Sequence, residues 1–405
     1  QTIFIPPMCD HTRPLTAALE AAGLEAVALP DSDQETIDLG RSQTSGKECY
    51  PLILTVGDFL KITRRKDFSP SRSALFMPSS NGPCRFGQYS RYLSLIMKRI
   101  GCGELEVIAL DQTGGMYEAL DRLCPGARTR LSRGLWLALA GTDLLQKALL
   151  HTRPREISPG LAQAAYGESL ADLTECLARG RKEAVRSMKR ARERFEAART
   201  KPNGALPRPL VGVLGEIYVR SNRFANEDVI GRLEALGAEV AAPPFTEWVF
   251  YTGFVNSMRA RREGLWRRQL ACSLTFLVQE LDLAALARPW SGFFPGPAKE
   301  PPIREVIGLG EKFLHRSFQG EAILSLGKGL EYYQHGARGL VNIMPFTCMP
   351  GMIVGGLTNR LRSLTGGMPA LSLAFDGQSQ TNTQARLEAF MYQVRTFQNP
   401  AGPKN

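Results

Sequence analysis

The sequence predicts an α/β fold in which two flavodoxin-like (Rossmann-like) parallel-sheet lobes flank an inserted helical region. Short apolar runs alternate with helix-patterned segments, which is typical of parallel strands joined by helical crossovers. This unit recurs in both halves of the chain, where Gly23 and Gly237 close equivalent helices. The length of 405 residues also exceeds what one hydrophobic core usually holds together. We therefore expect three parts, residues 1–114, 115–207 and 208–405.

The first lobe, 1–114, begins with a predicted strand, loop, helix and strand. Ile3–Ile5 and Ala26–Leu29 are short apolar runs, and Leu15–Gly23 between them has apolar residues at helical spacing. A further strand at Ser73–Met77 precedes a helix at Tyr89–Ile100. Strands that alternate with helices in this way predict a parallel sheet.

The second lobe, 208–405, repeats the pattern. The apolar run that starts at Val211 is followed by a helix at Val229–Gly237 and a short strand at Ala238–Ala242. A strand at Gly339–Met344 then precedes a helix at Met352–Leu361. We expect a second parallel sheet of the same kind.

The middle region, 115–207, has helical periodicity and few strand signals, and we expect helices at Leu135–Leu150 and Leu161–Thr200. Its last segment, Arg179–Lys201, holds ten Lys or Arg against three Asp or Glu. A solvated basic helix is the ordinary interpretation of such a segment. The alternative is a docking face for an acidic partner protein or a nucleotide-like anionic substrate.

Composition narrows the class of protein. The chain carries a formal charge of +11 and is 43% hydrophobic, as in globular proteins. There is no uncharged apolar run of membrane-spanning length and no signal-peptide pattern at the start, so we expect a cytoplasmic protein without a membrane-spanning helix. A second basic cluster surrounds Trp266, but no nucleic-acid-binding module is present, so nucleic acid is not an expected partner. No Walker, GxGxxG or GxSxG motif occurs.

The eight cysteines fall into two groups. No CxxC pair occurs and the chain has only four His, so any metal site must be assembled from distant segments. Four cysteines lie in loops that lead into predicted helices: Cys9, Cys49, Cys84 and Cys348. Because ligands of α/β sheets gather outside the carboxyl ends of the strands, these loops can converge. Four thiolates that converge in this way suit a 4Fe-4S cluster or a zinc ion. The alternative is that the four cysteines lie apart and bind no metal.

The remaining cysteines have apolar neighbours on predicted helices, and we interpret them as small hydrophobic residues: Cys102, Cys124, Cys176 and Cys272. Four weaker candidates are polar residues near strand ends or beside glycine or cysteine: Glu216, Asp376, His11 and His335. Carboxylates and imidazoles at such positions take part in catalysis in some proteins, and in others they cap helices or stabilise turns.

Several motifs together resemble the 2-hydroxyacyl-CoA dehydratase and benzoyl-CoA reductase superfamily. Within it they are most similar to the branch of activase-associated, double-cubane-type iron–sulfur proteins. The resemblance extends from Cys9 to about Gln378 and rests on the segments Met8–His11, Gly46–Pro51 with Thr55–Lys61, Gly82–Tyr89, Gly215–Arg220 with Phe224–Asn226, Met344–Gly351 and Phe375–Gln378.

This resemblance implies two flavodoxin-like lobes with an iron–sulfur cluster between them, and it assigns Cys9, Cys49, Cys84 and Cys348 as cluster ligands. It also implies an activase ATPase as electron donor, a CoA thioester or small molecule as substrate, and a homologous dehydratase-type subunit or a second copy as partner. A 4Fe-4S cluster is the expected cofactor. A double-cubane 8Fe-9S cluster is the alternative, but it needs more thiolates than these four.

Three functions follow as expectations. The first is the iron–sulfur component of an ATP-dependent, low-potential reductase or radical dehydratase, active in anaerobic metabolism. The second is a non-catalytic electron-relay or scaffold subunit of such a system. The third is a protein that kept the fold with a structural zinc or no metal. Whether the chain is itself an enzyme, and which residues are catalytic, is left open at this point.

Overall fold

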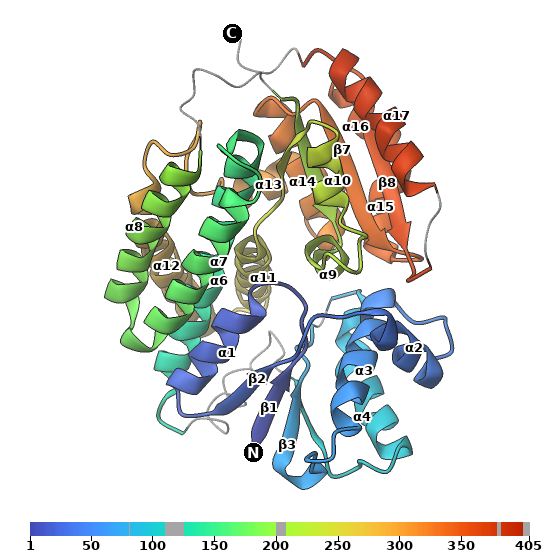
Figure 1. The fold of residues 1–405 in the computed structure, drawn as a ribbon. Coiled ribbons are helices and arrows are strands. Elements are labelled where there is room, and N and C mark those ends of the chain that lie inside the picture. The colour runs from blue at the N-terminus through green and yellow to red at the C-terminus, as the bar shows by residue number, and fades with distance from the viewer. Residues whose placement is uncertain (81, 110–124, 200–207, 379–381, 400–405) are drawn as a thin grey trace.

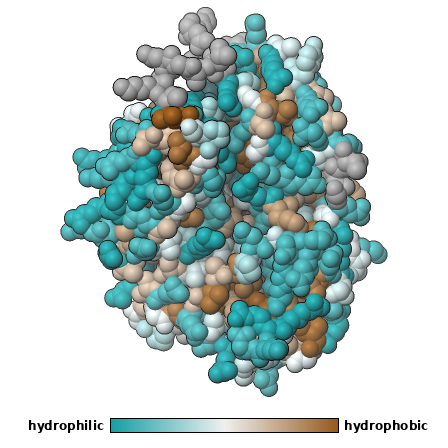
Figure 2. All heavy atoms as spheres, viewed as in Figure 1, coloured by the Kyte–Doolittle hydropathy of each residue, from teal (hydrophilic) through white to brown (hydrophobic). Residues whose placement is uncertain are grey.

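The computed structural model confirms the expected fold class. It describes residues 1–405 except 81, 110–124, 200–207, 379–381 and 400–405. Two four-stranded parallel sheets form separate lobes, and a bundle of helices lies beside both of them (Figure 1). The face shown in Figure 2 is mainly hydrophilic, with smaller apolar patches between the polar side chains.

The first sheet has the strand order β2-β1-β3-β4, and Thr2 of β1 is in register with Glu25 of β2 and Ser73 of β3. Ile3 and Ile5 alternate with less buried residues along β1, which explains the short apolar signal. The elements of this lobe are β1 (Thr2–Ile5), α1 (Thr12–Ala21), β2 (Glu25–Ala28), α2 (Gln34–Gln43), α3 (Tyr50–Thr63), β3 (Ser73–Phe76), α4 (Tyr89–Arg99) and β4 (Glu106–Ile108).

The second sheet has the order β6-β5-β7-β8, which is the same order counted within its own lobe. Both sheets thus follow the flavodoxin-like arrangement, in which the first strand lies between the second and the third. The elements of this lobe are β5 (Leu210–Gly215), α9 (Ile217–Ser221), α10 (Val229–Ala235), β6 (Glu239–Ala241), α14 (Glu321–Gln334), β7 (Gly339–Pro345), α15 (Met349–Gly356), α16 (Thr358–Leu364), β8 (Ala370–Phe375) and α17 (Thr383–Thr396).

The helical region draws on two parts of the chain, one on each side of residue 208. Its core joins Trp136, Leu173 and Phe195 from the first part to Trp290 and Phe293 from the second. Its helices are α6 (Arg128–Thr152), α7 (Leu161–Cys176), α8 (Arg181–Ala198), α11 (Phe245–Arg262), α12 (Trp266–Ala287) and α13 (Ile303–Gly310).

The helix expected at Leu161–Thr200 is two helices, α7 and α8. The chain reverses between them at Gly180, whose φ of 82° lies in the left-handed region that favours glycine. The two helices then pack against each other.

One segment, Trp266–Trp290, is long and apolar enough to cross a membrane by length and composition, although no uncharged run of that length exists. One segment of this kind is weak evidence of a membrane span, because helices of soluble proteins have the same length and composition. The expectation of no membrane-spanning helix rested on the missing uncharged run, and two acidic residues, Glu280 and Asp282, do interrupt the apolar part of this helix. One of them, Asp282, is buried and pairs with Arg133 and Arg181 at 2.8 and 2.9 Å. These contacts hold the end of α12 within the helical region.

Candidate functional site

A cavity of about 310 Å³ lies where the carboxyl ends of both sheets meet the helical region. The segments that follow β1, β3, β5 and β7 all contribute to its wall, as the switch-point rule for parallel sheets predicts. Helix α11 closes it with Trp248, Val249, Thr252 and Val255. Most of the lining is apolar, so polar groups in the wall are poorly hydrated.

Three of the four sequence-predicted cysteines line this cavity. Cys49, Cys84 and Cys348 come from segments of the chain that are far apart, and each stands directly before the first turn of a helix. The Cys84 Sγ accepts a hydrogen bond from the Phe86 N–H at 3.4 Å. Helix N-termini with unpaired N–H groups stabilise thiolates, so these positions suit thiolate ligands.

Arg85 ties the three cysteine loops together. Its guanidinium donates to the backbone oxygen of Lys47 at 3.0 Å, and to the backbone oxygen and hydroxyl of Thr347, both at 3.2 Å. Lys47 lies two residues before Cys49, and Thr347 directly precedes Cys348. One side chain next to Cys84 therefore fixes the positions of the other two loops.

Two half-buried carboxyl groups share the cavity wall with the thiols. Glu216 begins α9 and accepts hydrogen bonds from the N–H groups of Tyr218 and Val219 at 3.1 and 2.8 Å. Glu321, at the start of α14, accepts from the Ile217 N–H at 3.3 Å. Burial and the nearby Glu216 raise the pKa of Glu321 to about 8, and burial also raises the pKa of Glu216.

Gly215 places Glu216 at the wall. Its φ is 110°, and a Cβ at this position would lie 2.0 Å from the Ile343 oxygen of the neighbouring strand. Only glycine fits so close to β7, and the chain turns out of β5 directly into Glu216.

Cys9 lies apart from this group and is not among the residues that line the cavity, although its neighbour Met8 is. Its Sγ is 3.2 Å from Nδ1 of His11, whose Nε2 is 2.9 Å from Oδ1 of Asp143. Asp143 on α6 also accepts from the N–H groups of Phe245 and Thr246, each at 2.8 Å. Burial lowers the pKa of His11, but the neighbouring thiol and carboxylate raise it to about 10.

The other sequence candidates have structural roles. Asp376 accepts from the Gln378 N–H at 2.9 Å within a turn, and His335 ends α14 beside Glu331. Cys176 is buried next to Asp172 and Arg190, as a structural cysteine would be. Cys102 and Cys272 are half-buried, and Cys124 lies outside the described residues.

A metal centre at this cavity would be held by Cys49, Cys84 and Cys348, the three thiols in its wall. Among the described residues, no three His, Cys, Asp or Glu side chains lie close enough to share one metal ion. Burial raises the pKa of Cys84 to about 12 and raises that of Cys348 as well, so without added positive charge these thiols stay protonated. A polynuclear iron centre would supply that charge, and the cavity between the thiols is far larger than an ion.

Sequence reasoning missed Arg85, Glu321 and the apolar wall from α11. Arg85 lies inside the Gly-Pro-Cys-Arg-Phe-Gly motif, so its place next to a candidate ligand was a usable signal. Glu321 and α11 had no such signal, because their role depends on how α14 and the helical region pack against the lobes. No protein-family model matches this chain, and no curated protein shows significant similarity to it.

Proposed function

We propose that this protein is the iron–sulfur component of a low-potential reductase or radical dehydratase system of the 2-hydroxyacyl-CoA dehydratase and benzoyl-CoA reductase type. The observation that carries the proposal is the convergence of Cys49, Cys84 and Cys348 on one cavity between two flavodoxin-like lobes. The resemblance of the sequence motifs to that superfamily supports the same assignment, because it names these three cysteines as cluster ligands.

In this proposal, the three cavity cysteines hold a 4Fe-4S cluster, which supplies one electron at a time at low potential. Cys9 becomes a fourth ligand only if its side chain leaves His11. A double-cubane cluster would need further thiolates, and the cavity wall provides no fourth cysteine among the described residues. The electron donor is an activase ATPase, and the acceptor is a CoA thioester or another small molecule.

The side chains of the wall have definable tasks. With a pKa of about 8, Glu321 keeps a proton near neutral pH and can deliver it to a group bound in the cavity. Trp248, Val249 and Val255 exclude water, which protects a reduced intermediate from protonation by solvent. A proton donor in the cavity wall favours a catalytic subunit over an electron relay.

The test is anaerobic purification of the whole chain, with iron and acid-labile sulfide quantified and an EPR spectrum recorded after dithionite reduction. We expect iron and sulfide in equal amounts and a spin-1/2 signal that a CoA thioester perturbs. An unperturbed signal would favour the relay function. Zinc, or no metal under anaerobic conditions, would contradict the proposal.

A further inference from the structure

Helix α12 presents an apolar stripe that nothing in the described structure covers. The exposed fractions of its side chains are 66% for Trp266, 53% for Leu270, 55% for Leu274, 53% for Leu277 and 54% for Leu281. On the opposite side, Phe276 packs against Phe250 with ring centroids 5.0 Å apart. The helix is therefore anchored by one side, and its outer side is available.

The spacing of the stripe is that of a helix-pairing seam. Leu270, Leu274, Leu277 and Leu281 follow one another at intervals of four, three and four residues, which is the spacing of a and d positions in a coiled coil. From Trp266 to Leu281 the stripe extends about 22 Å, or four turns. A second helix can lie along it over this whole length.

Positive charge marks one end of the stripe. Five arginines lie within ten residues of the turn between α11 and α12, with Glu263 among them: Arg259, Arg261, Arg262, Arg267 and Arg268. In the described part of the chain, none of the five forms an ion pair with an acidic side chain within 4 Å. They are available to an acidic partner.

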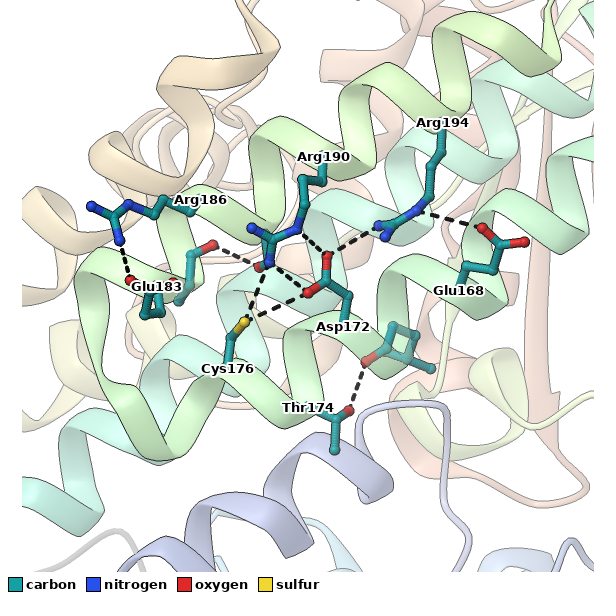
Figure 3. Close-up of polar contacts among 11 residues, drawn as sticks. Glu168, Asp172, Thr174, Cys176, Glu183, Arg186, Arg190 and Arg194 are labelled. Atoms are coloured by element: carbon teal, nitrogen blue, oxygen red, sulfur yellow. Dashed lines mark hydrogen bonds and ion pairs between the residues drawn. The ribbon is translucent and has the colours of Figure 1, made fainter.

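Helix α8 is the basic segment for which a docking face was the alternative to a solvated helix, and it differs in this respect. Figure 3 shows Arg190 and Arg194 of α8 directed at Asp172 of α7, and Arg186 at Glu183. Arg192 pairs with Glu196 as well. Most of the positive charge of α8 is therefore neutralised within the chain, whereas that beside α12 is not.

We propose that the α12 face, defined as this stripe and the five arginines, binds an acidic partner protein that presents an amphipathic helix. A second copy of this chain fits less well, because two copies that each carry a net charge of +11 repel one another. At the far end of the stripe, the carboxylate of Asp282 is already paired with Arg133 and Arg181 and so offers little to the arginines of a second copy. A lipid surface fits less well too. Between Arg268 and Glu280 the helix has no charged residue, so basic groups do not flank the stripe along its length.

The face adjoins the thiol cavity, since Arg259 also lines that cavity. A partner seated on α12 would thus lie next to the candidate site. The proposal does not depend on which cofactor the cavity holds.

Two synthetic peptides of about three heptads test the proposal. They share the same Leu seam, and one has Glu and the other Lys at the flanking positions. We expect the full chain to bind the Glu peptide in fluorescence anisotropy, to bind the Lys peptide at least about tenfold more weakly, and to lose affinity as salt rises. Equal binding of both peptides, or no binding of the Glu peptide, would overturn the proposal.

Variants locate the binding site. Leu274→Ser/Leu277→Ser and Arg267→Glu/Arg268→Glu should each weaken binding of the Glu peptide by about tenfold or more. Leu95→Ser/Tyr392→Ser, which alters exposed apolar residues on α4 and α17, should leave it unchanged. Circular dichroism confirms that each variant is folded. If instead the leucine variant abolishes dimers in sedimentation, or binding to vesicles of phosphatidylserine and phosphatidylcholine, the occupant is a second copy or a membrane and the proposal is wrong.

Discussion

Arg85 and Thr347 are 262 residues apart in the chain, yet the Arg85 Nη2 donates to both the backbone oxygen and the hydroxyl of Thr347 at 3.2 Å. This contact joins the two lobes at the point where Cys84 and Cys348 reach the cavity. Thr347 has a φ of 61°, a conformation that β-branched residues rarely adopt. Strain of this kind persists only where neighbouring contacts hold the backbone in place, and Arg85 provides such contacts.

Replacing Arg85 should loosen the metal centre without removing a ligand. We expect Arg85→Met to release iron to a chelator about tenfold faster than the unaltered protein, because residues that position ligands typically contribute this much to metal affinity. Arg91→Met, at an exposed position on the nearby helix α4, is the control. Equal release from both variants would show that Arg85 does not position the loops.

Lys328 should be the most sensitive charged residue in the second lobe. Its side chain is fully buried and lies 3.1 Å from Glu331 and 3.6 Å from Glu247, with Glu300 closer still. Lys328→Met removes the fully buried cation that these carboxylates share, while Glu300 keeps Lys147 at 2.7 Å, and should lower the free energy of unfolding by about 3–5 kcal/mol in urea titrations. Lys61→Met removes a pair with the exposed Asp33 and should cost about 1 kcal/mol or less. Similar losses in the two variants would contradict this account.

The stability of the protein should depend on pH through His11. Its pKa is raised from 6.5 to about 10 in the folded state, so the stabilisation is complete below pH 6.5 and is lost as the pH rises through 10. We expect the free energy of unfolding to fall between about pH 7 and 10, and to fall less in Asp143→Asn, which lacks the carboxylate. Parallel pH profiles of the two proteins would show that the buried His11–Asp143 pair does not contribute.

Two glycines test the packing of α2 on α3. A Cβ at Gly57 would lie 1.8 Å from the Thr36 oxygen, whereas a Cβ at Gly253 on α11 has no atom within 4 Å. Gly57→Ala should therefore destabilise by about 1–3 kcal/mol, and Gly253→Ala should stabilise by about 0.5–1 kcal/mol. Thermal unfolding of both variants measures the difference. A neutral Gly57→Ala would mean that the helices can separate without cost.

The sequence predicted the two sheets well because local signals define them. Alternating apolar runs and helix-ending glycines depend on near neighbours, whereas the strand orders were implied only by the flavodoxin-like resemblance. The loops that carry Cys49, Cys84 and Cys348 were also placed correctly, since each one follows or precedes a clear element. What these signals cannot give is the direction of a side chain, and so Cys9 was grouped with cysteines that it does not join in the cavity wall.

Long-range packing determines the features of the fold that were not predicted from the sequence. The sequence assigned α11 and α12 to the second lobe by position alone, whereas their apolar residues pack against α6 and α8. In the sequence, only the basic residues around Trp266 were noted in α12, and its exposed apolar face was not predicted. Both properties arise only when segments on each side of residue 208 come together.

The central claim is that the cavity thiols hold an iron–sulfur cluster, and comparison of single cysteine variants tests it most directly. Cys49→Ser, Cys84→Ser and Cys348→Ser, purified anaerobically, should each lose most of the iron and the EPR signal, because each removes a ligand from the cavity wall. Cys9→Ser should retain more iron than these three, and Cys272→Ser, on the outer helix α12, should retain nearly all of it. Equal iron content in Cys49→Ser and Cys272→Ser would contradict the assignment of the cavity as the cluster site.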